Sequence, residues 1–276
     1  MPELPEVETI RRALSKALRG TSITSCRILT PGVVSFLSED GPPSFPLRIQ
    51  RFARKGKFLC LTFEGDQHLL VHLRMTGGFY FRKETENRHP HTHVEFVLGT
   101  GEILSYRDPR RFGRHWWVKG LDPFSIPPVS SIGPDALEID LEEFTSRISS
   151  HRRMIKPLLL DQRVVSGLGN IYVDETLHRA RIHPKTLSHR IRKKRLGELW
   201  ASMRETLEAA IKAGGSSIRN YVSSDGLAGT FQVRHRVYDR EGQPCLVCGK
   251  AIRRIIVAQR GTWYCQRCQR YRSPRV

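Results

Sequence analysis

The chain has 276 residues, of which 39% are hydrophobic and 26% charged, so it has enough apolar material for one large core or two smaller ones. Lysine and arginine outnumber acidic residues by 46 to 27, which gives a net charge of +19. This excess predicts a polyanionic partner, with an anionic membrane surface as the alternative. No segment approaches the roughly 18 apolar residues of a membrane span, and residues 1–25 lack a signal-peptide apolar region, so we expect that no part of the chain spans or crosses a membrane.

The first part of the chain predicts one helix followed by strands. Residues 5–19 carry apolar side chains at helical spacing and are followed by Gly20, which predicts an amphipathic helix. From about residue 21 to 118, short β-rich runs alternate with turn residues, which is typical of antiparallel strands. The expected strands are 57–63, 68–74, 78–82, 94–98, 103–106 and 115–119. This order favours a β-sandwich over a sheet built from βαβ units.

The second part predicts helices and then a small basic module. Residues 120–134 contain four prolines and two glycines, which indicates a linker. The expected helices are 141–149, 157–162 beginning at Pro157, 171–180, and a long one that includes 196–211. Residues 214–231 are rich in glycine and serine and predict a loop. Residues 232–276 carry nine more positive than negative charges and predict a β-type module that contacts phosphate.

Pro2 is the most informative single residue, because removal of Met1 would leave a secondary amine at the N-terminus. An α-amino group has a pKa of about 7.7–8.0, so part of it is neutral and nucleophilic at pH 7. Attack on a sugar C1′ would give an iminium, which acts as an electron sink. Glu3 is a candidate proton donor or acceptor beside it, with Glu6 one turn further on. The alternative is that Pro2 and Pro5 only begin the helix.

Four cysteines near the C-terminus have the spacing of a zinc site. Cys245 and Cys248 form one Cys-x2-Cys pair, and Cys265 and Cys268 form another after sixteen intervening residues. Two such pairs predict a tetrahedral, structural zinc with no open position. Cys26 and Cys60 are isolated and are expected to be reduced core residues. The grouping of the other four favours metal binding in a reducing cytoplasm over disulfides. The predicted hairpin between the pairs would present Arg260 at its tip, where the alternative is an ordinary solvated charge.

Three further motifs suit a DNA partner, although each has an ordinary structural explanation. The turn at 167–170 lies between two predicted helices and could bind a phosphate, or could be a plain connection. Arg152 and Lys156 lie just upstream. The run 106–114 places arginines around Phe112, which suits a wedge into a base stack or a solvated turn with Phe112 in the core. Residues 54–57 could bind phosphate or be solvated.

Together these segments resemble the bacterial formamidopyrimidine-DNA glycosylase (Fpg/MutM) family. Five separated pieces match in the right order over nearly the whole chain. They are Met1–Glu8, Lys55–Lys57, Asp108–Gly113, Gly167–Tyr172, and the four-cysteine finger with Gln259–Thr262. The resemblance implies an α+β fold: an N-terminal β-sandwich with a helix, a helix-two-turn-helix domain, and a C-terminal zinc-finger hairpin. The implied domains are 1–120 (catalytic), 121–135 (linker), 136–231 (helical) and 232–276 (zinc finger).

The resemblance implies a glycosylase and lyase that removes 8-oxoguanine and formamidopyrimidines from duplex DNA after flipping the damaged nucleotide. It implies Pro2 as nucleophile, Glu3 as acid and base, Glu6 as support for the site, and Lys57 and Arg260 as proton donors in β- and δ-elimination. The implied gap fillers are Met75, Arg110 and Phe112. The implied DNA contacts are His91, Lys156, Asn170 and Tyr238, to which Arg152 is added from its position, and the loop at 217–230 would cover the extruded base.

We therefore expect a monomer that binds damaged DNA in the bacterial nucleoid and holds one zinc ion. Two alternatives stay open. An endonuclease VIII-like enzyme would share the fold but remove oxidised pyrimidines, although Leu4 and the 108–113 turn resemble the purine branch. A zinc-finger DNA-binding protein without catalysis would use Pro2 only as a helix start.

Overall fold

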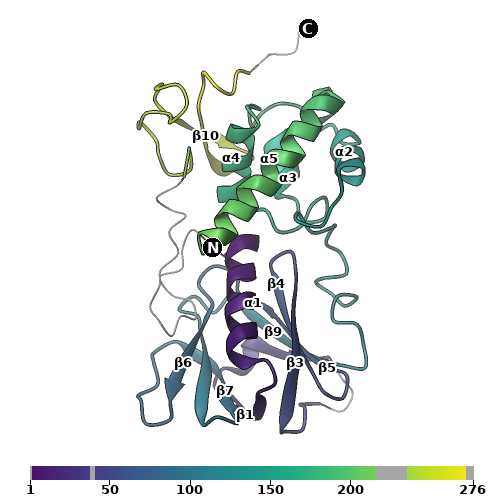
Figure 1. The fold of residues 1–276 in the computed structure, drawn as a ribbon, viewed down its shortest axis with the longest axis vertical. Coiled ribbons are helices and arrows are strands. Elements are labelled where there is room, and N and C mark those ends of the chain that lie inside the picture. The colour runs from purple at the N-terminus through teal and green to yellow at the C-terminus, as the bar shows by residue number, and fades with distance from the viewer. Residues whose placement is uncertain (1, 38–40, 216–234, 272–276) are drawn as a thin grey trace. The chain divides into compact units, whose positions relative to one another are not determined.

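The computed structural model describes residues 2–37, 41–215 and 235–271 (Figure 1). Contacts within the chain divide it into two compact units. The first, here called the sheet unit, comprises residues 1–131 and 214–230, and the second, the zinc unit, comprises 132–213 and 231–276. Each is described by itself. None of the described helices is long and apolar enough to cross a membrane.

The sheet unit consists of one helix and nine strands. Helix α1 spans Leu4–Leu18. A short 3-10 turn at Pro31–Val33 follows the first strand. The strands are β1 (Ser22–Ile28), β2 (Val34–Phe36), β3 (Leu47–Lys55), β4 (Phe58–Phe63), β5 (Gln67–His72), β6 (Gly78–Lys83), β7 (Thr92–Leu98), β8 (Glu102–Arg107) and β9 (Arg114–Lys119). The predicted helix and all six predicted strands are therefore present, with small shifts at their ends.

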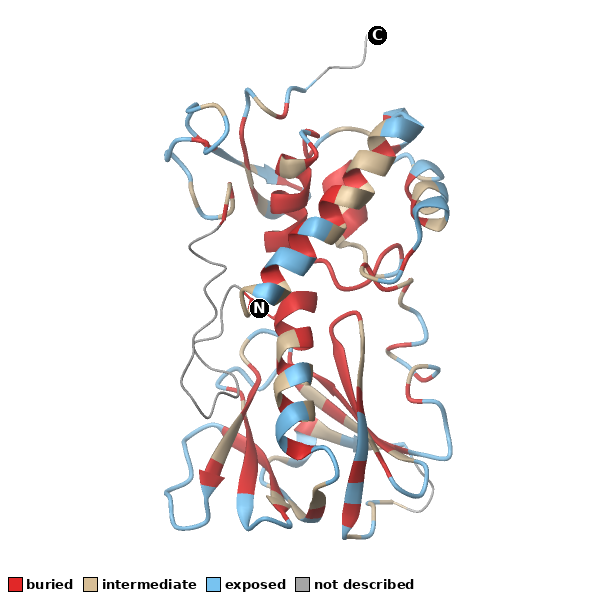
Figure 2. Cartoon of the chain, viewed as in Figure 1, coloured by how far each residue is buried: buried red, intermediate tan, exposed pale blue. Residues whose placement is uncertain are grey.

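The nine strands form two halves that share one core, which confirms the predicted sandwich. The hydrogen-bonded order is β2-β9-β5-β4-β3-β1-β7-β8-β6. Between β3 and β1 the strand register pairs Ser22 with Arg48 and Ile23 with Leu47, so the two halves meet at a short seam. Apolar side chains from both halves pack with Val7, Ile10 and Leu14 of α1. Figure 2 shows α1 with buried and exposed positions along its length. Burial of these apolar side chains is what holds the start of α1 in place.

The zinc unit begins with helices. Helix α2 spans Leu141–Ser149, α3 Ile155–Leu160, α4 Asn170–Arg179 and α5 Lys193–Lys212, with a 3-10 turn at Ser188–Arg190. Helix α4 is buried along most of its length, whereas α5 buries one stripe (Figure 2). The unit ends in the antiparallel hairpin of β10 (Arg253–Val257) and β11 (Arg260–Tyr264), which confirms the hairpin predicted between the two cysteine pairs.

One predicted helix start is wrong. Pro157 was expected at the first helical position, but α3 begins two residues earlier, at Ile155. The amides of Ile155 and Lys156 donate to the carbonyls of Thr186 and Pro184 at 2.8 and 3.2 Å. A loop distant in sequence thus satisfies the first helical donors, and Pro157 falls where no N–H is needed. Such a tertiary contact leaves no local signal in the sequence.

Candidate functional site

The start of α1 is a reciprocal cap made by two glutamates. Glu3 is the N-cap residue, its side chain accepts from the backbone of Glu6, and the amide of Glu3 donates to Glu6 Oε2 at 2.9 Å. Pro2 precedes this cap directly, and the side chains of Glu3 and Glu6 are 2% and 0% exposed. Two carboxylates at a helix N-terminus are stabilised by the backbone amides and the helix dipole. Pro2 is thereby attached to a rigid, acid-lined helix start.

A buried ion pair connects α1 to the turn that carries Lys57. Arg54 Nε lies 3.3 Å from Glu8 Oε2, and Arg54 also donates to the carbonyl of Gly56 at 3.0 Å. Gly56 and Lys57 form the two-residue turn between β3 and β4, since Lys55 pairs with Phe58. Although burial opposes ionisation, hydrogen bonds from Arg11 and Arg12 and the charge of Arg54 lower the pKa of Glu8 to about 2. The positive charges at 54–57 thus serve partly to position this turn.

Asp108 organises the next predicted motif from inside the protein. Its carboxylate is fully buried and accepts from the amides of Arg110 and Gly113 at 3.2 and 2.8 Å. The hydroxyl of Thr76 also donates to it, so the loop carrying Met75 is joined to the 108–113 turn. Gly113 must be glycine, because a Cβ there would lie 1.7 Å from the hydroxyl oxygen of Tyr106.

This framework presents the three predicted gap fillers at the surface. Met75 is 41% exposed and Phe112 46% exposed, and the guanidinium of Arg110 lies 4.9 Å from the centre of the Phe112 ring. The alternative of a core-facing Phe112 is therefore wrong. His91 is also exposed, and its carbonyl accepts from the amide of Asp108 at 2.9 Å. Large apolar side chains exposed on a stiff turn are suited to insertion between bases.

In the zinc unit, Lys156 lies in the interior and contacts protein groups. Its Nζ lies 2.7 Å from Asp174 Oδ1 and donates to the carbonyl of Gly261 at 3.0 Å, and both side chains are 0% exposed. We therefore correct the predicted direct contact of Lys156 with DNA, because an ammonium buried on these partners does not reach a phosphate. Burial raises the pKa of Asp174 to about 7, and the charge of Lys156 opposes that rise.

Helix α4 fixes the zinc module by two adjacent acidic residues. Asp174 Oδ2 accepts from the amide of Trp263 at 3.0 Å, and Glu175 accepts from the amides of 236–238 at 2.8 to 2.9 Å. Asn170, the first residue of α4, donates to the carbonyl of Gly261 at 3.0 Å. Asp174 and Glu175 were not predicted from the sequence. Their one visible signal is a pair of adjacent acidic residues in a helix whose other residues are neutral or basic, within a strongly basic chain.

The remaining predicted contacts occupy different parts of this unit. Arg260 is exposed at the start of β11, directly beside the carbonyl of Gly261 that Lys156 and Asn170 hold. Arg152 is exposed before α3. Tyr238 is half-buried, with its ring 4.6 Å from that of Trp263. The predicted loop at 217–230 lies outside the described residues. Gly215, which belongs to the sheet unit, lies against the α1 cap, since a Cβ there would lie 2.9 Å from Glu6 Oε1.

The four predicted cysteines form one cluster whose dimensions fit zinc. Their sulfur atoms all lie within 4.8 Å of one another, with 3.4 Å between Cys248 and Cys265 and 3.9 Å between Cys245 and Cys268. A tetrahedral zinc with Zn–S bonds of about 2.3 Å requires sulfur atoms about 3.8 Å apart. Four protein ligands leave no position for water, so the metal is structural. It holds the base of the β10–β11 hairpin.

These features define a zinc-containing protein whose helical unit positions a basic hairpin and whose sheet unit carries a capped amino-terminal helix and an exposed wedge. Family models match all three parts: the formamidopyrimidine-DNA glycosylase N-terminal domain at 1–115, its H2TH domain at 132–222, and the zinc finger found in FPG and IleRS at 242–270. The chain therefore belongs to the formamidopyrimidine-DNA glycosylase family.

Individual relatives agree over almost the full length. The formamidopyrimidine-DNA glycosylase of Bacillus subtilis is 42% identical over 280 residues, covering 98% of this chain and 99% of the relative. A Lactococcus lactis Fpg variant, solved with DNA containing Fapy-dG, is 36% identical with a TM-score of 0.89, and 98% of this chain and 100% of that one are covered. MutM solved with DNA containing carbocyclic 8-oxo-G is 36% identical with a TM-score of 0.87 and the same coverage.

Proposed function

We propose that the protein is a base-excision repair glycosylase that removes oxidised purines from duplex DNA and then cleaves the abasic site as a lyase. The observation that carries the proposal is the α1 cap, in which Pro2 precedes two buried glutamates on a rigid helix start. The family's substrates support the purine lesions, since its relatives were solved with Fapy-dG and 8-oxo-G DNA. The four-cysteine centre and the basic hairpin suit a DNA partner.

The proposed chemistry begins after removal of Met1, when Pro2 carries a free secondary amine. The lone pair of its nitrogen forms a bond to C1′ of the flipped nucleotide, the bond from C1′ to the base breaks, and the base leaves with a proton. Glu3 gives a proton to O4′ as the sugar ring opens, so C1′ and Pro2 are joined as an iminium. Glu6 keeps Glu3 and the helix start in place through the cap.

Two eliminations then release the sugar. The iminium acidifies the C2′ proton, and loss of that proton expels the 3′ phosphate, with Lys57 contacting phosphate and donating a proton. A second elimination expels the 5′ phosphate, assisted by Arg260 at the hairpin. Hydrolysis of the remaining iminium returns the amine of Pro2. Lys156 takes no direct part, and through Gly261 it positions the strand that begins with Arg260.

Insertion of side chains offsets the cost of extruding the damaged nucleotide. Met75, Arg110 and Phe112 would fill the gap, with Arg110 facing the unpaired base on the opposite strand. Unstacking costs a few kcal/mol, which an apolar wedge on a preformed turn can partly repay. His91, Arg152, Asn170 and Tyr238 would contact the backbone of the DNA.

Cleavage of matched duplexes tests the proposal and its rival. We expect the protein to nick duplexes carrying 8-oxoguanine far faster than those carrying thymine glycol, and to leave undamaged duplexes intact. Preference for thymine glycol would instead favour an endonuclease VIII-like enzyme. Binding of both duplexes without cleavage of either would favour a non-catalytic DNA-binding protein.

A further inference from the structure

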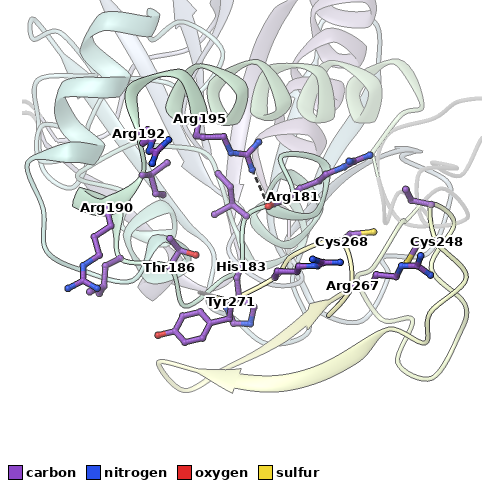
Figure 3. A pocket seen from close by; sticks show the side chains of 15 residues that line it. Arg181, His183, Thr186, Arg190, Arg192, Arg195, Cys248, Arg267, Cys268 and Tyr271 are labelled. Carbon is purple, nitrogen blue, oxygen red and sulfur yellow. Dashed lines mark hydrogen bonds between the residues drawn. The ribbon is translucent and has the colours of Figure 1, made fainter. Parts of the chain in front are cut away.

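The zinc unit contains a second concave site, at the opposite end of α4 from Asn170. The pocket has a volume of about 910 Å³ and is formed by the segment between α4 and α5 together with the cysteine-bearing turns (Figure 3). Helix α4 has ten residues and is therefore about 15 Å long. Asn170 at its first residue contacts Gly261 in the hairpin, whereas Ile182, just beyond its last, accepts from Gln269 at 2.9 Å. The pocket is thus separated from Asn170 and from the Gly261 end of the hairpin.

The pocket is strongly cationic. It is lined by six arginines and by no aspartate or glutamate. Arg195 forms an ion pair with Glu198 and donates to the carbonyl of Ala180 at 2.7 Å. The other five have no carboxylate within ion-pair distance among the described residues, and all are exposed: Arg181, Arg190, Arg192, Arg267 and Arg270.

Two further features change the electrostatic potential of this pocket, namely the start of a helix and the zinc centre. Helix α5 begins at Lys193, beside the pocket, with no side-chain cap and no acidic residue in its first turn, so its free amides add positive potential. A zinc ion with four thiolates carries a net charge of −2, and Cys248 and Cys268 line the pocket. Five unpaired guanidiniums exceed that charge, so the pocket retains an affinity for anions.

The walls are not purely polar. Ile182, Leu187 and Val247 contribute apolar surface, and the ring of Tyr271 lies 4.8 Å from that of His183. Planar guanidiniums bind phosphate in bidentate fashion, and a flat aromatic and apolar wall accepts a base. A volume of this size is typical of sites for small organic ligands.

We propose that this pocket binds a nucleotide through its phosphates, with the base against Tyr271 and the apolar wall. The nucleotide is either a free nucleoside polyphosphate or the phosphorylated 5′ end of a single strand, since both present the same chemistry. The site is separate from the one that handles the lesion.

Binding of a fluorescent ATP derivative (mant-ATP) at about 150 mM salt, where weak surface attraction is screened, tests the proposal. We expect saturable binding that tripolyphosphate competes away. Two double variants should each bind mant-ATP about tenfold or more weakly, because each removes two charge-assisted phosphate contacts. One combines Arg190→Ser with Arg192→Ser, and the other combines Arg181→Ser with Arg270→Ser. Arg147→Ser is the matched control, since Arg147 pairs with Glu143 on α2 outside the pocket.

Two further comparisons define the ligand and the separateness of the site. A single-stranded oligonucleotide with a 5′ phosphate that competes better than its 5′-hydroxyl form would identify the strand end, whereas equal, weak competition would identify the free nucleotide. Saturating 8-oxoguanine duplex with 5′-hydroxyl ends should leave mant-ATP bound. Absence of saturable binding, equal binding by both double variants and the control, or displacement by that duplex would overturn the proposal.

Discussion

Lys156 and Asp174 form an ion pair of 2.7 Å with both side chains withdrawn from solvent. The pair does not stand alone, because the same lysine holds Gly261 and the same aspartate holds the amide of Trp263. Two helices of the zinc unit, α3 through Lys156 and α4 through Asp174, are thereby connected to the backbone of the β11 strand at Gly261 and Trp263. The position of Arg260 therefore depends on residues that need not touch DNA.

Removal of one partner of this pair should destabilise the zinc unit strongly. Lys156→Met leaves a buried carboxylate without its cation, which typically costs about 3–5 kcal/mol. We expect a lower denaturation midpoint for this unit and a larger loss of δ-elimination than of base release, since Arg260 loses its support. Lys156→Met with Asp174→Leu should recover part of the stability. Equal losses of both reaction steps in a folded variant would contradict a positioning role.

Acid should destabilise the sheet unit in part through His115. Burial among Tyr106 and Phe79 lowers the pKa of His115 to about 3, whereas an unfolded histidine has a pKa of about 6.5. Between these values the unfolded chain binds a proton that the folded one does not, so stability falls as the pH decreases below about 6.5. For one group the loss from pH 7 to pH 5 is about 2 kcal/mol.

The variant His115→Phe should remove this share of the acid sensitivity. Urea denaturation at pH 7 and pH 5 measures it, with His189→Phe as the control because His189 is exposed in the zinc unit. The free energy of unfolding of the sheet unit should then differ less between the two pH values than in the parent protein. An unchanged difference would show that His115 is not the group concerned.

The exposed side chains of Met75 and Phe112 should contribute most to excision when the damaged base is paired with the opposite strand. Phe112→Ala and Met75→Ala remove exposed apolar side chains and no core contacts, so we expect little change in stability. Excision from a fully paired 8-oxoguanine duplex should fall by about tenfold or more, since the unstacking cost is a few kcal/mol. The same substitutions should slow excision less when the lesion lies within a bulge or a mismatch. Leu121→Ala, at another exposed apolar residue of the same unit, serves as the control. A loss that is the same for paired and unpaired lesions would argue against insertion.

Removal of zinc should impair the zinc unit and leave the sheet unit folded. Chelation removes the metal that joins the two cysteine pairs at the base of the hairpin, and it leaves the strand pairing and a small apolar cluster around Val237 and Ile252 to hold this part of the described chain together. We expect loss of DNA binding while the sheet unit stays folded, because its core contains no metal ligand. Binding and near-UV circular dichroism measure the two effects. An apo protein that binds DNA normally would exclude the hairpin from recognition.

Local sequence patterns were sufficient to predict most helices and strands and the zinc ligands, because hydrophobic periodicity, turn residues and cysteine spacing are local properties. The exposed Phe112 could not be separated from a core residue by sequence, since its exposure depends on Asp108, Thr76 and Tyr106 meeting inside the fold. Lys156 was mistaken for a DNA contact for the same reason. A charge in a basic chain indicates a surface group unless its buried partner is known, and Asp174 lies eighteen residues away.

Reduction of the reaction mixture with borohydride tests the central claim most directly. During turnover of 8-oxoguanine duplex, the iminium between Pro2 and C1′ should be reduced to a stable amine, and peptide mapping should place the sugar on the N-terminal peptide. A Pro2→Gly variant that retains Met1 should give no such adduct. A normal yield of adduct from that variant, or an adduct mapped to Lys57 in the parent protein, would contradict the assignment of Pro2 as the nucleophile.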